Sequence, residues 1–293
     1  LATHFATRPV TLRQALTVIT ERRLRTALTR GTVVRLRRGT FAVAERSDLG
    51  RYRQRIAASL AARPTSVASH ESALALWGLS LPWFGDPWNG HPVRLTSATG
   101  GRVRRAGLVV TQRPLPPGHV AATPWGPVTS PQRTAVDLAR EVPFVSALIS
   151  ADECCGLALL AEHGWTDGLP AARRSGSFLR RVMAEQTSGW SVECLAAVLT
   201  DAPLRHGRRR AQRVIDSVDP ASESPGESYS RAHLLSAGLP RPVAGLKVRG
   251  DDGARYYADL AWPELGVLAE VDGYGKYEKD NWKEFRREKR RED

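Results

Sequence analysis

Near its C-terminal end the chain reads Asp259-Leu260-Ala261-Trp262-Pro263 and then Leu265-Gly266-Val267-Leu268-Ala269-Glu270-Val271-Asp272-Gly273. Each of these apolar runs carries carboxylates, and burying a carboxylate in an apolar strand is costly unless it binds a cation or a partner. Glu270 and Asp272 are two residues apart, so on a strand they point to the same face. Two neighbouring strands can therefore direct Asp259, Glu270 and Asp272 at one point. Such oxygen ligands suit Mg²⁺, and an Mg²⁺ site in a strongly basic protein indicates phosphodiester chemistry.

The apolar residues directly before Glu270 bear on whether these carboxylates are buried. Val267, Leu268 and Ala269 favour a buried strand and therefore a metal site. The alternative is an exposed strand end whose charges are solvated.

The elements around this stretch follow a simple order. We expect a helix at about 227–238, followed by strands at about 243–248, 255–262 and 266–271. A basic helix then begins near Lys279 and contains Lys283, Arg286, Arg287, Lys289, Arg290 and Arg291. The predicted order is α-β-β-β-α.

Composition and charge narrow the classes of partner. The chain has 293 residues and a formal net charge of +13, and this length predicts two or three domains. The excess of basic residues favours a polyanionic partner, most simply nucleic acid. The alternative is a soluble protein whose Arg-rich composition does not reflect binding to a polyanion. Cys154, Cys155 and Cys194 form no Cys-x-x-Cys pair, which argues against a disulfide framework and a zinc site. They fit a reducing cytosol, and we expect no membrane-spanning stretch and no signal peptide.

The N-terminal segment reads as two helices and a hairpin. Apolar residues recur at helical spacing over 12–19, and Thr20 can cap a second, Arg-rich helix, although one long helix also fits. After Gly31, apolar residues alternate with arginines up to a turn at Arg38-Gly39. This order resembles a winged helix-turn-helix, and the alternative is a small module whose basic face is solvated. The arginines predicted to contact DNA are Arg22, Arg23, Arg25, Arg35, Arg37 and Arg38.

The middle of the chain reads as a mixture of helices and strands. We expect helices at about 56–62, 69–78, 130–140 and 147–163, and strands at about 93–97 and 107–113. His70, at a helix start, is interpreted as a capping or packing residue. Arg133 and Asp137 are interpreted as an ordinary ion pair along a helix.

A polar linker at 216–226, rich in Ser and Pro, is the best candidate for a domain boundary. The basic run Arg205-His206-Gly207-Arg208-Arg209-Arg210 before it is either a solvated face or a nucleic-acid contact. The predicted domains are a winged helix-turn-helix-like domain at 1–50, an α/β middle domain at 51–217 and a C-terminal domain at 218–293.

The C-terminal order and its carboxylates resemble the PD-(D/E)XK restriction-endonuclease-like superfamily, and residues 222–293 resemble its Vsr-like endonuclease domain. The phrases that carry this resemblance are Glu223-Ser224-Pro225-Gly226-Glu227-Ser228, Asp259-Leu260-Ala261-Trp262-Pro263 and Glu270-Val271-Asp272-Gly273. Residues 11–43 resemble the winged helix of AbiEi-type antitoxins of type IV toxin–antitoxin systems. Residues 69–73 and 128–139 resemble the body of such proteins, which implies an AbiEi-like middle domain.

The superfamily resemblance implies metal binding by Asp259 and Glu270, and a role for Glu227 in orienting the metal or the water. Asp272 stands where the superfamily has Lys, and a third anion there favours a second Mg²⁺ or raises a pKa in the crowded cluster. Lys276 could supply the missing cation. The implied metal is Mg²⁺, with Mn²⁺ as a substitute, held by Asp259, Glu270 and Asp272. The resemblance implies a catalytic role for Glu227, Asp259, Glu270, Asp272 and Lys276. The superfamily core ends with a further strand, which we expect to be missing from this chain.

Two functions follow from these expectations. The first is a cytoplasmic, α/β multidomain, DNA-binding protein whose restriction-endonuclease-like αβββα core is an Mg²⁺-dependent endonuclease that hydrolyses phosphodiester bonds. Its contacts with the DNA backbone would include Arg286, Arg287 and Arg290. The second is a non-catalytic AbiEi-like antitoxin or transcriptional regulator with a degenerate nuclease module, which Asp272 favours. DNA is the expected partner and a membrane is not; a homo-oligomer and a cognate toxin stay open.

Overall fold

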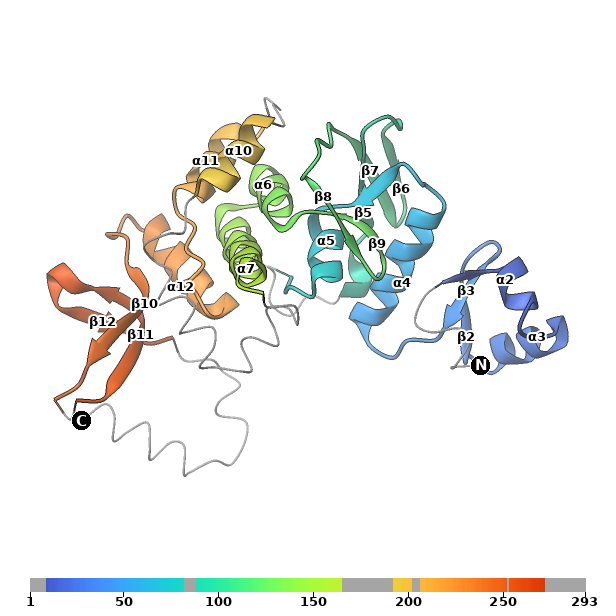
Figure 1. Ribbon diagram of the computed structural model, residues 1–293, viewed down its shortest axis with the longest axis horizontal. Helices are drawn as coiled ribbons and strands as arrows, with labels where there is room; N and C mark the ends of the chain where they lie inside the picture. The colour runs from blue at the N-terminus through green and yellow to red at the C-terminus, as the bar shows by residue number, and fades with distance from the viewer. Residues whose placement is uncertain (1–8, 82–87, 165–191, 202–205, 252, 272–293) are drawn as a thin grey trace.

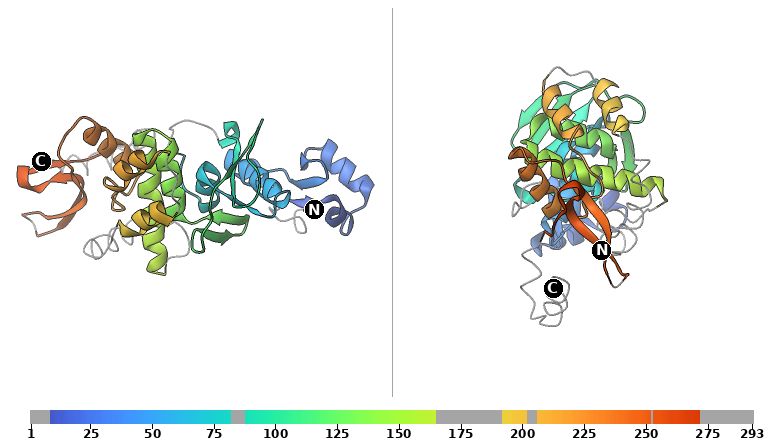
Figure 2. Two further views of the ribbon diagram at one scale, coloured as in Figure 1. Left: turned by 90° about the horizontal axis from the view of Figure 1, so that it is seen from above. Right: turned by 90° about the vertical axis from the view of Figure 1, so that its left-hand side faces the viewer.

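The computed structural model describes residues 9–81, 88–164, 192–201, 206–251 and 253–271, and these form an elongated, mixed α/β protein (Figure 1). The N-terminal helices and hairpin lie at one end, and a small C-terminal sheet lies at the other (Figure 2). A six-stranded sheet and a group of helices lie between them. The predicted α/β class is therefore confirmed.

Two short helices and a three-stranded antiparallel sheet, in the order β1-β3-β2, form the N-terminal part. They are β1 (Val10–Thr11), α2 (Leu12–Leu16), α3 (Glu21–Thr29), β2 (Val33–Arg37) and β3 (Thr40–Val43). The helices are separate, because Thr20 is in extended backbone and accepts a hydrogen bond from the N–H of Arg23 at 3.3 Å, which caps α3. The first helix ends at Leu16, earlier than predicted.

The central sheet has the strand order β6-β7-β5-β4-β9-β8, in which β5 with β7 and β4 with β9 are parallel pairs. Its elements are α4 (Asp48–Ala61), β4 (Ser66–Ala68), α5 (His70–Trp77), the 3-10 turn η1 (Trp88–Gly90), β5 (Val93–Ser97), β6 (Val103–Arg105), β7 (Leu108–Gln112), β8 (Val120–Thr123) and β9 (Gly126–Thr129). The predicted strands β5 and β7 are confirmed, whereas β4, β6, β8 and β9 were not predicted. Tyr52, Ile56 and Leu60 recur every fourth residue along α4 and are buried in the core beside the sheet.

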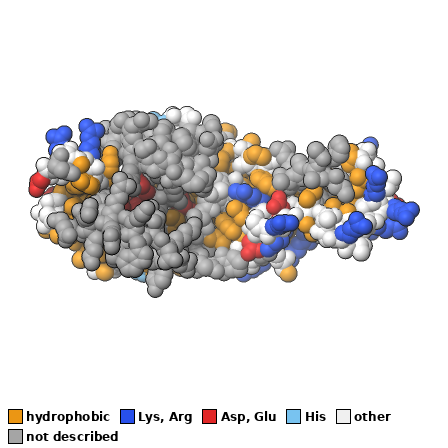
Figure 3. Space-filling view, turned by 90° about the horizontal axis from the view of Figure 1, so that it is seen from below, with side chains coloured by type: hydrophobic (Ala, Val, Ile, Leu, Met, Phe, Trp, Pro, Cys, Tyr) orange, Lys and Arg blue, Asp and Glu red, His pale blue; other side chains and the backbone are white. Residues whose placement is uncertain are grey.

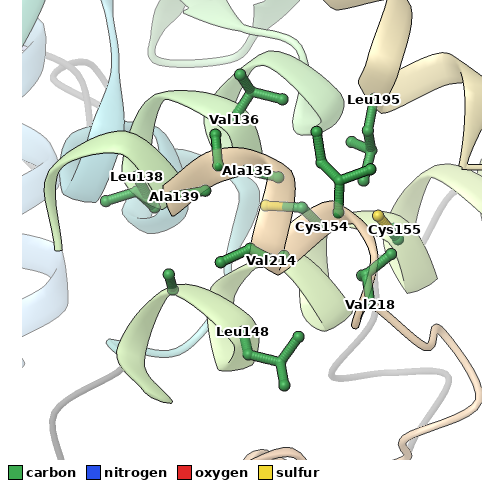
Figure 4. Packing of buried hydrophobic residues seen from close by; sticks show 14 of the residues in the cluster. Ala135, Val136, Leu138, Ala139, Leu148, Cys154, Cys155, Leu195, Val214 and Val218 are labelled. Carbon is green, nitrogen blue, oxygen red and sulfur yellow. The ribbon is translucent and has the colours of Figure 1, made fainter. Parts of the chain in front are cut away.

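Helices form the second half of the central part. They are α6 (Pro131–Glu141), α7 (Phe144–Glu162), α10 (Glu193–Asp201), α11 (Arg208–Ile215) and α12 (Pro225–Ser236). Figure 4 shows their shared core, in which Val136, Leu148, Cys154, Leu195 and Val214 come together from four of the helices. Cys154 and Cys155 are buried and unoxidised in this core.

Contrary to expectation, one helix within the described ranges, α7, is long and apolar enough by length and composition to cross a membrane. However, 78% of its most apolar stretch is buried inside the protein. Burial of this kind is the pattern of a core helix in a soluble protein.

The C-terminal sheet is an antiparallel meander in the order β10-β11-β12. Its elements are β10 (Val243–Arg249), β11 (Arg255–Trp262), the 3-10 turn η2 (Pro263–Leu265) and β12 (Val267–Ala269). The three strands lie where they were predicted, but the predicted burial of the last is wrong: Val267 is 45% exposed and Leu268 53% exposed. The reason is that β12 is a three-residue edge strand, and among the described elements β11 and η2 are its main contacts. The expected basic helix after it lies outside the described residues.

A buried ion pair joins the C-terminal part to the central helices. Arg231 of α12 is fully buried and donates hydrogen bonds to Asp152 of α7 and to the carbonyl oxygen of Ser217. Asp152 also accepts the N–H of Asp219 at 2.8 Å. Val218 is buried in the same core as α7, so the polar segment at 216–226 is packed rather than an exposed linker. The division into domains stays a prediction.

We expect the substitution Arg231→Ala to lower the free energy of unfolding by about 3–5 kcal/mol, because it leaves Asp152 buried without its partner. The double variant Asp152→Leu/Arg231→Met should recover most of this loss, since it removes both charges and keeps the volume filled. Urea denaturation followed by circular dichroism measures both effects. Arg255→Ala, which removes an exposed arginine, is the control, and a loss for Arg231→Ala no larger than for this control would contradict the anchoring role.

Candidate acidic site and nucleic-acid interface

Asp259 lies on β11, next to the end of β12. Its Oδ2 accepts a hydrogen bond from the N–H of Val271 at 2.8 Å. Leu260 pairs with Ala269, the last residue of β12, so Asp259 lies one residue beyond the paired register and Glu270 directly follows the strand. Asp259 therefore lies beside the end of β12, and the predicted ligand Glu270 follows at that end.

Glu227 lies in the first turn of α12, whose N-cap is Ser224. Its N–H donates to Ser224 Oγ at 3.1 Å, and its carboxylate accepts the N–H of Glu223 at 2.7 Å. Burial raises the pKa of Glu227 to about 7; the negative charges of Asp259 and Glu223 act in the same direction, and the hydrogen bonds with Ser224 and Glu223 oppose it. Helix α12 contacts β11, and Gly226, directly before Glu227, lies beside Val271.

Glu227 and Asp259 lie where α12 contacts β11, but the described residues there do not form a set of metal ligands. Within the described ranges, no three His, Cys, Asp or Glu residues lie close enough to hold a metal ion. Glu270 is exposed, as the alternative of a solvated strand end predicts. The other predicted site residues of the C-terminal domain, Asp272, Lys276, Arg286, Arg287 and Arg290, lie outside the described residues.

The N-terminal arginines predicted to contact DNA are all exposed, and together they form what we call the basic surface, at the N-terminal end of the molecule (Figure 3). They are Arg22, Arg23, Arg25, Arg35, Arg37 and Arg38. Leu24 and Ala27 turn the opposite face of α3 toward the core, so the arginines of α3 point outward. On the hairpin, Arg35 lies over the ring of Phe41 at 5.6 Å from its centroid. In the part of the chain that the structure describes, none of these arginines forms an ion pair with a carboxylate.

A second group of charged side chains lies between α5, α6 and the strands β5 and β7. We call it the buried charge cluster, although Glu141 lies at its exposed rim, and it comprises His70, Glu71, Arg94, Arg113, Arg133, Asp137 and Glu141. Asp137 accepts hydrogen bonds from Arg133 Nε and Arg113 Nη1, both at 2.9 Å. Glu141 accepts from Arg94 and Arg113, and its Oε1 lies 3.4 Å from His70 Nε2. The cluster therefore fixes α6 to two strands and to α5.

His70 has a φ of 53°, and it is the one non-glycine residue with a positive φ among those described. Such backbone strain costs about 1–3 kcal/mol and persists only where the surroundings over-determine it. Here the fully buried ring lies with Nδ1 at 3.0 Å from Ser69 Oγ, which in turn accepts the hydroxyl of Thr96 at 2.9 Å. His70 is thus a packing residue, as interpreted from the sequence, but one that the charge cluster holds under strain.

The pair Arg133–Asp137 is also more than the ordinary helix pair that the sequence suggested, because its side chains are only 0% and 2% exposed. The signal for this burial was present in the sequence. Arg133 and Asp137 share helix α6 with Val136 and Leu138, and all four lie in a segment that is buried on nearly every side. A charged residue within such a segment requires a buried partner.

Comparison with known proteins finds distant relatives. The chain is 26% identical over 256 residues to uncharacterized protein Rv2248 of Mycobacterium tuberculosis strain H37Rv, and equally to uncharacterized protein MT2308 of strain CDC 1551 / Oshkosh. The similarity covers 87% of this chain and 79% of each relative, so it extends over most of the parts described above. The chain matches no model of a known protein family.

We expect the substitution Glu141→Gln to destabilise the protein at neutral pH and to matter less in acid. Burial acts to raise the pKa of Glu141, but His70 and Arg94 outweigh it and hold the pKa well below its usual range. The stabilisation is therefore fully present above the unfolded-state pKa of about 4.3 and is lost as the pH falls below it. Removing these charge-assisted hydrogen bonds should cost about 1.5–3 kcal/mol at pH 7.

Urea unfolding of the wild type and the Glu141→Gln variant at neutral and acidic pH measures this difference. Glu264→Gln, which changes an exposed carboxylate on η2, is the matched control and should have little effect at either pH. A loss of stability for Glu141→Gln that is the same at both pH values would show that charge is not the cause.

Proposed function

We propose that this chain is a DNA-binding protein whose C-terminal part is an Mg²⁺-dependent, endonuclease-like module that hydrolyses phosphodiester bonds. The observation that carries this proposal is the corner where Glu227, Asp259 and the end of β12 meet. The order of α12, β10, β11 and β12 supports it, because it agrees with the resemblance to the PD-(D/E)XK superfamily. The cytoplasm is the proposed location.

The basic surface supports the DNA-binding half of the proposal. Its arginines are exposed and are not neutralised by neighbouring carboxylates, so they are available to phosphates. Two helices followed by a hairpin, with basic residues on α3 and on β2, also fit a winged helix-turn-helix. In such a domain a helix enters the major groove and the hairpin contacts the backbone.

The chemistry of the corner supports the catalytic half. A carboxylate with a pKa near 7, held beside a second carboxylate, is poorly stabilised as an anion and would gain from a bound cation. Asp259 and Glu270 would hold Mg²⁺, and Glu227 would accept a proton or orient a water molecule beside them. The metal would supply Lewis-acid polarisation of the phosphate and a lower pKa for the attacking water.

A non-catalytic AbiEi-like antitoxin or transcriptional regulator is the second candidate. The exposure of Glu270 and of Leu268 on β12 favours it, because an open edge is a poor enclosure for metal-dependent chemistry. Asp272 in the position of the superfamily Lys favours it as well. In that case the basic surface would still bind DNA, and the partners would include a cognate toxin or a second copy of the chain.

We expect the variant Arg22→Ala/Arg23→Ala/Arg25→Ala to bind duplex DNA at least about tenfold more weakly near 0.1 M salt, because fewer phosphates are neutralised. The slope of log affinity against log salt should decrease in magnitude by about 2–3, since each neutralised phosphate accounts for about 0.9 of that slope. Gel-shift titrations across a salt series measure both quantities. The matched control is Arg102→Ala/Arg104→Ala/Arg105→Ala, which removes the same charge from exposed positions in and beside β6. Equal effects of the two variants would reject the basic surface as the DNA-binding face.

We expect Mg²⁺ or Mn²⁺ to raise the melting temperature of the wild type, because a metal that binds only the folded state stabilises it by about 2.7 kcal/mol at 100 times its Kd. Asp259→Ala should remove most of this gain together with any cleavage of DNA. Asp251→Ala, which changes an exposed carboxylate in the turn between β10 and β11, should leave both unchanged. Titration calorimetry that detects no binding of a divalent metal to the wild type would reject the catalytic function and leave the regulator.

A further inference from the structure

Helix α11 carries the most concentrated positive charge of the central part. Arg208, Arg209, Arg210 and Arg213 lie within its eight residues, and the helix itself contains no acidic residue. Ala211, Val214 and Ile215 are spaced three and four residues apart and are buried in the core with α6 and α7 (Figure 4). The inner face of α11 is therefore fixed by packing, and its arginines are presented on the outer face.

The outer face of α11 is exposed and is not neutralised. Arg208, Arg209 and Arg210 make no ion pair or hydrogen bond through their side chains within the described part of the chain. Arg213 lies over the ring of Phe144, with its guanidinium carbon 4.0 Å from the ring centroid, which restrains its position without neutralising its charge. The arginines of the buried charge cluster are paired with carboxylates, whereas, among the described residues, Arg208, Arg209 and Arg210 are not.

The position of these charges on the helix is intrinsically unfavourable. Three arginines occupy the first turn, at the positive end of the helix dipole, where acidic residues are normally favoured. The N-cap is Gly207, which has no side chain to accept the first N–H groups. Like charges placed side by side against the dipole raise the local positive potential, and an anionic partner relieves that cost.

We infer that the outer face of α11 is a second nucleic-acid contact, which binds the phosphate backbone of duplex DNA. The inference rests on the proposed DNA binding and adds a surface to it. Charge complementarity identifies the partner, because unpaired guanidinium groups match phosphates in geometry and charge. Such contacts carry no sequence information, so α11 would increase affinity rather than specificity.

The two surfaces lie apart on the elongated molecule, with α11 beside α10 in the central part and the basic surface at the N-terminal end (Figures 1 and 2). Two contacts carried by one chain make the second binding event intramolecular, provided that the DNA can reach both. The affinity for a long duplex should therefore depend on α11 more than the affinity for a short one.

The test uses the full chain with the substitutions Arg208→Ala, Arg209→Ala and Arg210→Ala made together. Alanine is a strong helix former and these positions are exposed, so α11 should stay folded; an unchanged circular dichroism spectrum and melting temperature verify this. Against a long duplex near 0.1 M salt, affinity should fall about tenfold and the salt slope should decrease in magnitude by about 2–3. The variant with the same three residues changed to Lys should keep most of the affinity.

The control Arg102→Ala/Arg104→Ala/Arg105→Ala separates a local effect from the change in net charge. If the α11 variant binds as tightly as this control, while the variant of the basic surface binds more weakly, the inference about α11 is wrong and the proposed DNA binding stands. If the wild type itself fails to bind duplex DNA at low salt, both are wrong.

Discussion

Burying the guanidinium group of Arg231 against Asp152 fixes the position of α12, and the candidate acidic site depends on that position. Glu227 lies four residues before Arg231, a spacing of about one turn that puts the two side chains on neighbouring positions of one helix face. The ion pair ties this helix to α7, and strand β11 contacts the same helix. A buried ion pair contributes little net stability, but its directional hydrogen bonds allow few alternative positions for the helix. The position of Glu227 near Asp259 therefore depends on how α12 packs against the central helices.

Two physical classes of arginine stand out among the described residues. Those of the first class, such as Arg133 and Arg231, are buried and bonded to aspartates, and they position helices. Those of the second class, such as Arg22 and Arg208, are exposed without a carboxylate partner and maintain a positive surface. Among the described residues the excess positive charge therefore lies with the second class, because the buried carboxylates neutralise the first. Composition alone cannot separate these classes, since both consist of the same residue.

Much of the fold could be predicted from local patterns, and the misses have physical causes. Strands β10 and β11 have seven and eight residues, long enough for a pattern to show. Strand β4 has three residues, and its place between β5 and β9 depends on partners that are distant in sequence. The expected burial of β12 was wrong because apolar residues identify a strand but do not say whether another layer covers it. The burial of Arg133 and Asp137 was missed because an ion pair at this helical spacing is usually exposed, and the pattern does not show that Arg113 from another segment completes the pairing.

The environment of Glu227 bears on both candidate functions, because the proposed metal site would use its burial and a helix cap alone does not require it. A carboxylate in the first turn of a helix gains from the helix dipole as long as it stays ionised. Such a cap contributes about 1 kcal/mol and functions well at the surface. Glu227 is instead buried beside Asp259, which makes the ionised form costly and opposes the capping gain. A cap alone gains nothing from this burial, whereas a carboxylate that meets a cation between α12 and β11 recovers the stabilisation that burial removes.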